Sequence, residues 1–563
     1  MVIDLETLRN EIIGNNTFFN TPFGKRIITY ADYTASGKTL RFIENYLQKV
    51  QECYANTHTI DSFSGKTMTG IVQKAEKKIK QLLGANNNNY LIPVGSGATG
   101  AIAKLCDVLG LYISPCLRIH INKLRNNIRA EDINKIINYF HHIKPIIFVG
   151  PYEHHSNYLI WKESLAEVIE IKLTQDMEFD YDDLIKKLKQ YPNRVKMGSF
   201  SAASNITGVL TDVYKVAEIM HNHNGFVFFD FAASAPYIEI NMNKNRKSYF
   251  DAIFLSPHKF IGGPGSSGLL VINKKLYSNL YPPTICGGGT VEFVSPYYYE
   301  FIKDVEVREN AGTPGILQLI KAALVLELKA LIGYDKIIEI ETRMLHKAFK
   351  ELNNDEKIII YGPKVVKKRI SIISFNIKHK NKLLHHRFVS KLLNDLFGIQ
   401  SRAGCACAGP YAHRLLGINK EKSKLLNSAL KENEALRPGF VRINFHYLMS
   451  DEEVEFIIEA IKFISKYGYL FLTQYTVNTK TGEWTHNYLL DYNDRVTNFG
   501  LKECLEYIEL KKENQNNINK TLEYRKYLDE AYHIAKILNK VNNLEYKKFH
   551  NIKHEFLRWF NFI

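Results

Sequence analysis

Short apolar segments alternate with helical stretches between residues 90 and 275. They are rich in β-branched and aromatic residues, as buried strands between helices are. The segments are YLIPV (90–94), PIIFVG (145–150), VKMGSF (195–200), FVFFD (226–230), FDAIFLS (250–256) and GLLVI (268–272). This pattern predicts an α/β fold with a mostly parallel sheet covered by helices. Such sheets bind ligands at the carboxyl ends of their strands.

A second, α+β pattern follows the first. Residues 316–335 form an amphipathic helical pattern that is expected to end near Gly333, and Ser450 is the expected N-cap of another helix. The remaining elements are expected at 369–377 (strand), 385–397 (helix), 439–445 (strand) and 451–467 (helix). We therefore divide the chain into an N-terminal segment (1–30), a large domain (31–315), an interdomain helix with a small domain (316–468) and a mainly helical C-terminal extension (469–563). A hairpin is expected around residues 479–484 of the extension.

The composition is that of a globular protein. Of the 563 residues, 45% are hydrophobic and 23% are charged, which excludes disorder along the whole chain. The seven cysteines form no CxxC pair, so neither a disulfide framework nor a zinc site is expected. The N-terminus lacks a signal-peptide pattern, and no apolar run approaches the roughly 18 residues that cross a bilayer. We expect a cytoplasmic protein that does not contact membranes.

The net charge of +16 raises the question of nucleic-acid binding. The excess lysine is spread along the chain, together with asparagine, isoleucine and tyrosine, and forms no basic stripe interleaved with aromatic residues. This distribution favours a solvated lysine-rich surface, with weak attraction to polyanions through net charge alone. Specific nucleic-acid binding is not expected.

Lys259 is the strongest single indication of chemistry. It follows the predicted strand FDAIFLS in the sequence Ser256-Pro257-His258-Lys259 and precedes a glycine-rich segment. A lysine at a buried strand end is costly unless it is paired or chemically used. Desolvation lowers the pKa of such an amine and suits it to form a Schiff base. The alternative is a lysine whose amine extends to the surface.

Other predicted strands also end in polar or ionisable groups. The segment Gly95–Gly100 (GSGATG) opens a helix after YLIPV, where backbone amides and hydroxyls can bind a phosphate. Asp230 ends FVFFD, and a buried carboxylate there requires a cationic or N–H partner. His154 follows PIIFVG, and Asn205 follows SFSAAS. These residues are expected to meet at one edge of the sheet.

Taken in order, these motifs resemble the class V aminotransferase fold of pyridoxal-phosphate enzymes, and within it the cysteine desulfurase and selenocysteine lyase group. The resemblance runs from about Ala31 to Tyr467 and is carried by GSGATGAI, EHHSN with Trp161, SNITG, DFAASAP, SPHK, GGGTV and AGTP. It implies fold type I, with a mostly parallel seven-stranded sheet, and pyridoxal 5'-phosphate as the cofactor.

The resemblance also assigns roles to individual residues. Lys259 is implied as the Schiff-base lysine, His154 as the ring-stacking histidine that also moves protons, and Asp230 as the partner of the pyridine nitrogen. The other implied cofactor contacts are Ala98, Thr99, Ser256 and His258 at the phosphate, Asn205 near the ring oxygen and substrate, and Thr290 in a loop offered to a neighbouring subunit's phosphate. A homodimer with shared active sites follows from that last assignment.

The reaction depends on the segment SRAGCACAGP (401–410), which resembles the desulfurase loop that carries the nucleophile. The alignment puts Cys407 at the nucleophile position, with Cys405 two residues earlier. Thiolate chemistry on a mobile loop suits attack on a substrate's sulfur. Arg442 resembles the arginine that binds the substrate's α-carboxylate. The implied reaction converts L-cysteine to L-alanine and leaves a persulfide on Cys407, from which a sulfur-acceptor protein could take the sulfur.

Two departures keep alternatives open. Ala233 stands where the desulfurase pattern has glutamine, and Cys405-Ala406 replace a histidine pair before the nucleophile. A lyase that eliminates sulfide directly, or an aminotransferase or epimerase of the same fold, would not need Cys407. A non-catalytic scaffold that binds an anionic partner is the alternative outside enzymes, and Lys259 with Asp230 argues against it.

Overall fold

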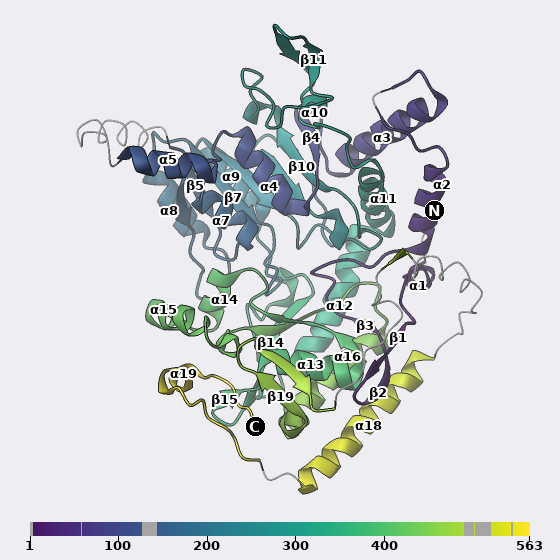
Figure 1. Ribbon diagram of the computed structural model, residues 1–563, viewed down its shortest axis with the longest axis vertical. Helices are drawn as coiled ribbons and strands as arrows, with labels where there is room; N and C mark the ends of the chain where they lie inside the picture. The colour runs from purple at the N-terminus through teal and green to yellow at the C-terminus, as the bar shows by residue number, and fades with distance from the viewer. Residues whose placement is uncertain (1–3, 58, 126–143, 489–499, 502–518, 542–543) are drawn as a thin grey trace.

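The computed structural model describes residues 4–57, 59–125, 144–488, 500–501, 519–541 and 544–563. Figure 1 shows a large α/β layer in its upper half and a second layer of helices and strands below it. The two layers are joined by a pair of consecutive helices, α11 (Ile316–Ile332) and α12 (Tyr334–Leu352). Gly333 separates them with a φ of +96°, a value at which glycine is favoured.

The upper layer is built on a seven-stranded sheet, which confirms the predicted fold class. Only β10 runs antiparallel to its neighbours, and the other strands all run in one direction. In spatial order the strands are β4 (Asn89–Val94), β10 (Gly268–Asn273), β9 (Ala252–Leu255), β8 (Gly225–Asp230), β7 (Lys196–Ser201), β5 (Ile146–Val149) and β6 (Glu167–Glu170). Six of the seven coincide with the apolar segments predicted from the sequence. The seventh, β6, lies at the edge of the sheet. Its sequence, EVIE, contains no apolar run, so the sequence did not predict it.

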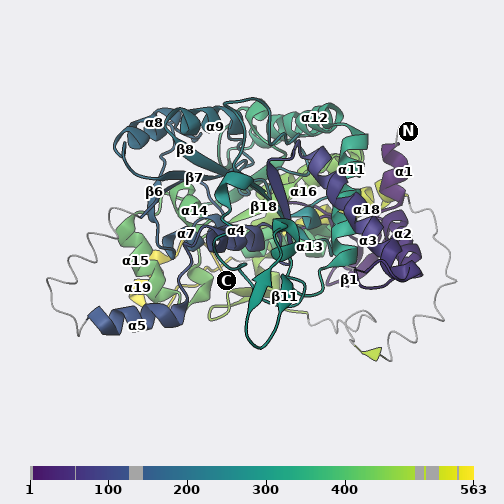
Figure 2. The same ribbon diagram turned by 90° about the horizontal axis from the view of Figure 1, so that it is seen from above.

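Both faces of this sheet are buried. Alternate residues of β8 face opposite cores, with Val227 and Phe229 on one side and Phe228 on the other. Viewed from above in Figure 2, α8 (Tyr181–Lys189) and α9 (Val213–Asn222) lie on one side, with α4 (Gly97–Val108) and α7 (Leu159–Lys162) on the opposite side. Helices on both faces explain why the strands read as continuous apolar runs.

The lower layer contains a five-stranded sheet, and its elements match the predicted second α+β pattern. The strand order is β13 (Ile358–Ile360), β14 (Ile372–His379), β18 (Phe440–Asn444) and β17 (Arg402–Gly404), and β15 (Lys382–Leu383) also pairs with β14. Helices α13 (His386–Phe397) and α16 (Asp451–Tyr467) pack near it. Ser450 caps α16 as predicted, through a capping box with Glu453.

The extension packs on the lower layer. The expected hairpin forms from β19 (Tyr475–Asn478) and β20 (Glu483–His486), after the short helix η6 (Gly468–Gln474). The long helix α18 (Lys520–Val541), yellow in Figure 1, lies beside the N-terminal hairpin of β1 (Phe18–Thr21) and β2 (Gly24–Ile27). Part of the predicted extension lies outside the described residues, and the domain boundaries at 30, 315 and 468 stay predictions.

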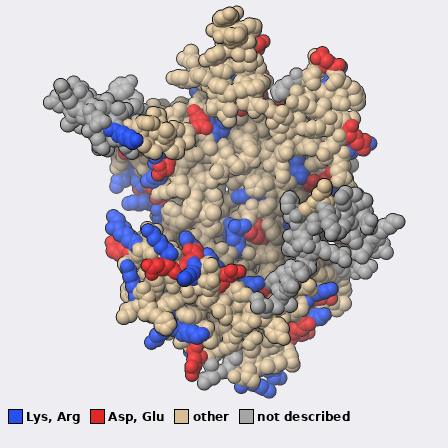
Figure 3. Space-filling view, in the orientation of Figure 1, with Lys and Arg blue, Asp and Glu red and all other residues tan. Residues whose placement is uncertain are grey.

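The remaining elements complete the two layers. They are α1 (Leu5–Asn10), α2 (Arg41–Gln51), α3 (Phe63–Leu82), α5 (Pro115–Arg125), α10 (Val305–Arg308), α14 (Gly409–Leu415), α15 (Lys420–Ala429), α19 (Ile552–Leu557), β3 (Thr29–Tyr30), β11 (Val291–Val294), β12 (Tyr299–Phe301), β16 (Ile399–Gln400) and the 3₁₀ turns η1 (His155–Asn157), η2 (Pro257–Lys259), η3 (Lys274–Leu276), η4 (Val366–Lys368) and η5 (Glu434–Leu436). Within the described part of the chain, no helix is long and apolar enough to cross a membrane. On the face in Figure 3, lysine and arginine side chains lie among aspartate and glutamate side chains.

Candidate active site

A cavity of about 270 Å³ collects the carboxyl ends of several strands of the large sheet. Residues of the small sheet and of the loop after β17 complete its wall. Every predicted site residue except Thr290 lines this cavity: Ala98, Thr99, His154, Asn205, Asp230, Ser256, His258, Lys259, Cys407 and Arg442. The fold therefore brings together groups that are up to 344 positions apart in the chain.

Lys259 ends the turn η2, directly after β9. Burial lowers the pKa of its amine to about 8, although the Asp230 carboxylate opposes that shift. No described residue forms a hydrogen bond with its Nζ. An amine that is readily neutral, and that faces a cavity without a hydrogen-bond partner, is available as a nucleophile.

Asp230 is the last residue of β8 and is 6% exposed. Its Oδ1 accepts a hydrogen bond from the Ala232 amide at 2.8 Å, and burial raises the pKa of the carboxyl. Among the described residues, none donates to Oδ2. This oxygen can therefore accept a hydrogen bond from a cationic ring nitrogen in the cavity.

The N-terminus of α4 forms a cradle against the turn that holds Lys259. The Ala98 amide donates to Ser256 Oγ at 2.9 Å. Gly97 has a φ of +58°, and a Cβ there would lie 2.8 Å from Ser256 Oγ and 3.0 Å from His258 Cε1. Only glycine allows this close approach. The helix N-terminus and the Ser256 hydroxyl together favour an anion.

His154 and Thr99 are linked through Ser156, which the sequence analysis did not single out. Ser156 Oγ lies 2.7 Å from Thr99 Oγ1 and 3.1 Å from His154 Nδ1. Burial, with the neighbouring Lys259 charge, lowers the pKa of His154 to about 4. The imidazole is therefore neutral at neutral pH and can stack on an aromatic ring or accept a proton.

A buried carboxylate behind the cavity explains the spacing of the EHHSN segment. Glu153 accepts hydrogen bonds from Asn157 Nδ2 at 2.6 Å and from the amide and hydroxyl of Ser201 at 2.8 and 2.6 Å. Asn157 in turn accepts from Trp161 Nε1 at 3.1 Å. Glu153 thus ties the His154 segment to β7. A single glutamate in the sequence carries no such signal, so Glu153 was missed.

The two cysteines of the loop after β17 lie in different environments. Cys407 is exposed and lines the cavity, whereas the Cys405 thiol donates to the Pro438 carbonyl at 2.9 Å and is absent from the lining. Burial raises the pKa of Cys405 and keeps it protonated. Cys407 has a φ of +55°, a left-handed conformation that is strained in a non-glycine residue.

Three hydrogen bonds that the sequence did not reveal, made by Asn205 and His155, hold this loop against the cavity. Asn205 Nδ2 donates to the Ala406 carbonyl at 2.6 Å. The His155 amide donates to the Cys407 carbonyl at 2.7 Å, and His155 Nε2 accepts from the Gly409 amide at 2.9 Å. His154 therefore lies in the cavity wall, while His155 positions the loop.

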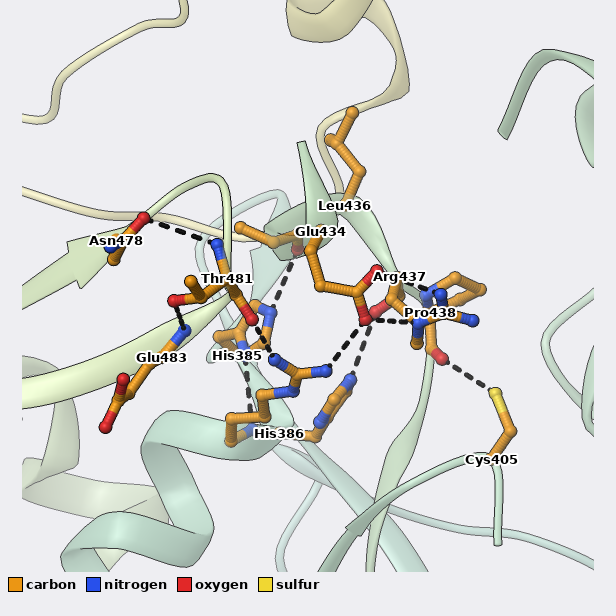
Figure 4. A network of polar contacts seen from close by, with 12 residues as sticks. His385, His386, Cys405, Glu434, Leu436, Arg437, Pro438, Asn478, Thr481 and Glu483 are labelled. Atoms are coloured by element: carbon orange, nitrogen blue, oxygen red, sulfur yellow. Dashed lines mark hydrogen bonds and ion pairs between the residues drawn. The ribbon is translucent and has the colours of Figure 1, made fainter. Parts of the chain in front are cut away.

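The far side of the loop rests on residues 434–438, shown in Figure 4. Each of four consecutive carbonyls there accepts a side-chain hydrogen bond. The pairs are His385 with Ala435, Trp559 with Leu436, His386 with Arg437, and Cys405 with Pro438, at 3.0, 3.0, 3.1 and 2.9 Å. The Ala435 amide also donates to the Thr479 carbonyl at 3.1 Å. Hairpin β19–β20 and the C-terminal residues of the extension thus support the segment that holds Cys405.

Arg442, on β18, is the buried arginine of the cavity. Its Nη1 donates to the Asn205 carbonyl at 3.0 Å and its Nη2 to Asp32 at 2.7 Å. Its Nε is buried without a partner among the described residues. Arg402, predicted only as part of the loop, also lines the cavity.

Thr290 lies away from the cavity, and its Oγ1 donates to the Gly287 carbonyl at 2.7 Å. Its predicted role concerns the active site of a second copy, so that role stays a prediction. No described residue beyond 468 lines the cavity either.

The fold and the cavity together define an α/β enzyme of fold type I, in which a lysine and an aspartate at strand ends face an anion cradle. Residues 130–457 match the profile of the family described as aminotransferase class-V, and the chain belongs to this family of pyridoxal-phosphate-dependent enzymes.

Similar proteins carry a more specific name. A probable cysteine desulfurase of Pyrococcus abyssi is 31% identical over 325 residues, which cover 57% of this chain and 72% of that protein. One of Staphylococcus aureus is 24% identical over 458 residues, 80% of this chain and 96% of that protein. The solved structure of an apo cysteine desulfurase from Thermococcus onnurineus NA1 covers 82% of this chain and 98% of its own, with a TM-score of 0.63 at 24% identity. That structural likeness concerns the fold.

The residues of the cavity fit pyridoxal phosphate. Its aldehyde requires an amine without a competing partner, which Lys259 offers. Its phosphate requires the cradle at the start of α4, and its pyridine nitrogen requires a carboxylate such as Asp230. Asn205 Oδ1 is buried and has no partner among the described residues, so a polar group in the cavity would satisfy it.

Proposed function

We propose that this protein is a cysteine desulfurase, which converts L-cysteine to L-alanine and leaves the sulfur as a persulfide on Cys407. One observation carries the proposal: Cys407 lines the cavity together with Lys259 and Arg442, and Cys405 does not. The similarity to proteins named probable cysteine desulfurase supports it.

In this proposal Lys259 holds pyridoxal phosphate covalently, and Asp230 faces its ring nitrogen. Ala98, Thr99, Ser256 and His258 hold the phosphate, and Asn205 and His154 contact the ring. When bound, the cofactor supplies an electron sink for charge that develops on the substrate. The protein supplies the groups that orient the substrate and move protons.

Arg442 orients the substrate by binding its α-carboxylate, because a guanidinium recognises a carboxylate through two parallel N–H donors. The Cys407 thiolate then attacks the substrate's sulfur. An S–S bond forms, the Cβ–S bond breaks, and the electron pair of the broken bond stays with the substrate carbon. That carbon takes up a proton, which Lys259 or the neutral His154 is placed to deliver, and becomes the methyl group of alanine.

The test is an assay of the cofactor-loaded protein with L-cysteine and a reductant, in which alanine and sulfide are measured together. Equal amounts of both products are expected from the wild type. Both should fall by at least about 100-fold in Cys407→Ala and in Lys259→Ala, since each variant lacks an atom that reacts. Cys405→Ala is the matched control and should keep most of the activity.

Products that survive Cys407→Ala would identify a lyase that eliminates sulfide directly. Ala233 lines the cavity at the position where the desulfurase pattern has glutamine, and this departure favours the lyase as a second candidate. Absence of turnover with the cofactor bound would leave an aminotransferase or epimerase of the same fold.

A homodimer is part of the proposal. Hairpin β11–β12 projects at the top of Figure 1 and exposes aromatic side chains, with Tyr297 at 91% and Tyr299 at 65% exposure. Such a surface is typical of an interface, and the Thr290 loop precedes it. A dimer is expected in sedimentation, and a monomer with full cofactor occupancy would contradict shared active sites.

The compartment and the sulfur acceptor are also proposals. A reducing cytoplasm agrees with the six described cysteines, all of which are free. A sulfur-acceptor protein would reach the persulfide through the exposed side of Cys407.

A further inference from the structure

Two arginines face each other across a pair of strands at the cavity wall. Arg402 on β17 is the register partner of Arg442 on β18, so their side chains lie on the same face of the sheet. Like charges directly opposite each other in an antiparallel pair repel. Something must hold these two guanidinium groups together.

Asp32 does so. Its Oδ1 accepts a hydrogen bond from Arg442 Nη2 at 2.7 Å, and its Oδ2 accepts one from Arg402 Nε at 2.9 Å. One carboxylate thus bridges both arginines, and each contact is a charge-assisted hydrogen bond. The Asp32 side chain is 12% exposed and that of Arg442 is 4% exposed, so water weakens this bond little, whereas the Arg402 side chain is 48% exposed and its bond is more open to water.

The backbone holds Asp32 beside the sheet that carries the arginines. It follows β3, which pairs in parallel with β16 next to the cysteine loop. The preceding residue, Ala31, donates to the Gln400 carbonyl at 3.0 Å and accepts from the Asn444 amide at 2.9 Å. Asp32 therefore sits on a segment that is hydrogen-bonded on both sides.

Asp32 binds the two arginines without itself lining the cavity. Both arginines line the cavity, whereas Asp32 does not. The Arg442 Nε is buried and has no partner among the described residues. Asp32 therefore leaves donors of both guanidinium groups available to a ligand on the cavity side. A carboxylate in the cavity would compete with the substrate for the arginines, whereas Asp32, outside the lining, can orient them.

We propose that Asp32 is a positioning residue, which holds Arg402 and Arg442 as a paired site for the α-carboxylate of the amino-acid substrate. The proposal rests on the role of Arg442 given under the proposed function, and it adds Arg402 and Asp32 to that role. The chemical class of ligand is an amino acid with a free carboxylate.

The test uses the cofactor-loaded protein and does not require turnover. L-Alanine and L-alaninamide have the same size, but only L-alanine carries a carboxylate. Each is titrated while the cofactor's absorbance is followed, and the ratio of the two affinities is the readout. In the wild type L-alanine should bind at least about tenfold more tightly, as a charge-assisted pair implies.

In Asp32→Asn the ratio should fall by about tenfold, because the arginines lose the charge that holds them together. Affinity for L-alaninamide should stay within about twofold. A general loss of structure would instead weaken both ligands equally, and that outcome overturns the proposal. An unchanged ratio overturns it as well.

If Asp32→Asn fails to fold, Asp32→Glu provides the test instead. It keeps the charge but moves the carboxylate by one methylene group, so the ratio should fall by about threefold. Glu555→Gln is the matched control, since Glu555 contacts Arg558 and Lys382 outside the cavity. Its ratio should equal that of the wild type. A protein that discriminates the two ligands but releases no sulfide would refute the desulfurase proposal and leave the role of Asp32 intact.

Discussion

At the scale of single residues, the cavity is defined by groups that burial pushes toward their neutral forms. The pKa of Lys259 is lowered to about 8 and that of His154 to about 4, while that of Asp230 is raised. Such perturbed groups gathered in one cavity are typical of an active site. Lys259, whose pKa lies above neutral pH, also lowers the stability of the protein without its cofactor, because the folded state must bury its charge.

Lys259 allows a direct measurement of that effect. Below its folded pKa of about 8 the amine is protonated in both the folded and unfolded states, and folding carries the full desolvation cost. Between pH 8 and 10.5 the unfolded state binds more protons, so stability rises with pH. Lys259→Met should therefore raise the melting temperature of the cofactor-free protein by roughly 2 °C at pH 7.

The advantage of Lys259→Met should shrink between pH 8 and 10.5, as the wild type ceases to bury an ammonium group. Thermal unfolding of both proteins at several pH values measures it. A constant difference across that range would mean that the amine has an ordinary pKa in the folded protein.

The site residues that the sequence predicted differ from those that it did not in how their positions are determined. Lys259, Asp230 and His154 follow apolar runs, so the expected strand ends predicted their meeting place. Asp32 and Glu153 act through partners that come from distant parts of the chain, such as Arg442 and Ser201. No local pattern encodes those pairs, so neither acid stands out in the sequence.

At the scale of elements, several short segments from different parts of the sequence support the cysteine loop. Carbonyls of residues 435–438 accept hydrogen bonds from His385 and His386 at the start of α13 and from Cys405 (Figure 4), and also from Trp559 among the C-terminal residues. The sequence predicted α13 and the hairpin separately. Their joint contact with one segment depends on tertiary packing and could not be predicted from either pattern alone.

Trp559→Phe tests that support. It removes the donor to the Leu436 carbonyl, and an unsatisfied buried carbonyl costs about 1–3 kcal/mol. The segment should open more often, so maleimide should modify Cys405 several-fold faster. The exposed Cys407 should react at its original rate. Mass spectrometry of the modified peptides distinguishes the two cysteines.

Trp484→Phe is a suitable control for this experiment. Trp484 packs against His385 in the same aromatic cluster, but its Nε1 makes no hydrogen bond to the described residues. If both variants accelerate modification of Cys405 equally, the effect comes from packing and the hydrogen bond to Leu436 has no special role.

At the scale of the whole molecule, the two ends of the chain are joined on the lower layer. Arg26, on β2, is 2% exposed, and its Nη2 pairs with Glu530 on α18 at 2.9 Å. Its guanidinium also lies 4.5 Å from the centre of the Tyr527 ring, and its Nε donates to the Leu396 carbonyl at 2.6 Å. Helix α18 therefore covers a buried charge contributed by the N-terminal hairpin.

Removing one member of a buried pair leaves the other charge uncompensated, which costs more than the pair itself contributes. Glu530→Gln should therefore lower the free energy of unfolding by about 1–3 kcal/mol, a range reduced because Glu530 is 37% exposed. Asp529→Asn, at an exposed neighbouring position, should change it by less than about 0.5 kcal/mol. Denaturant unfolding of the three proteins measures the difference. Equal stability of the two variants would show that α18 rests on the lower layer through its aromatic contacts, such as Tyr524 stacked on Phe456 at 4.1 Å, rather than through Arg26.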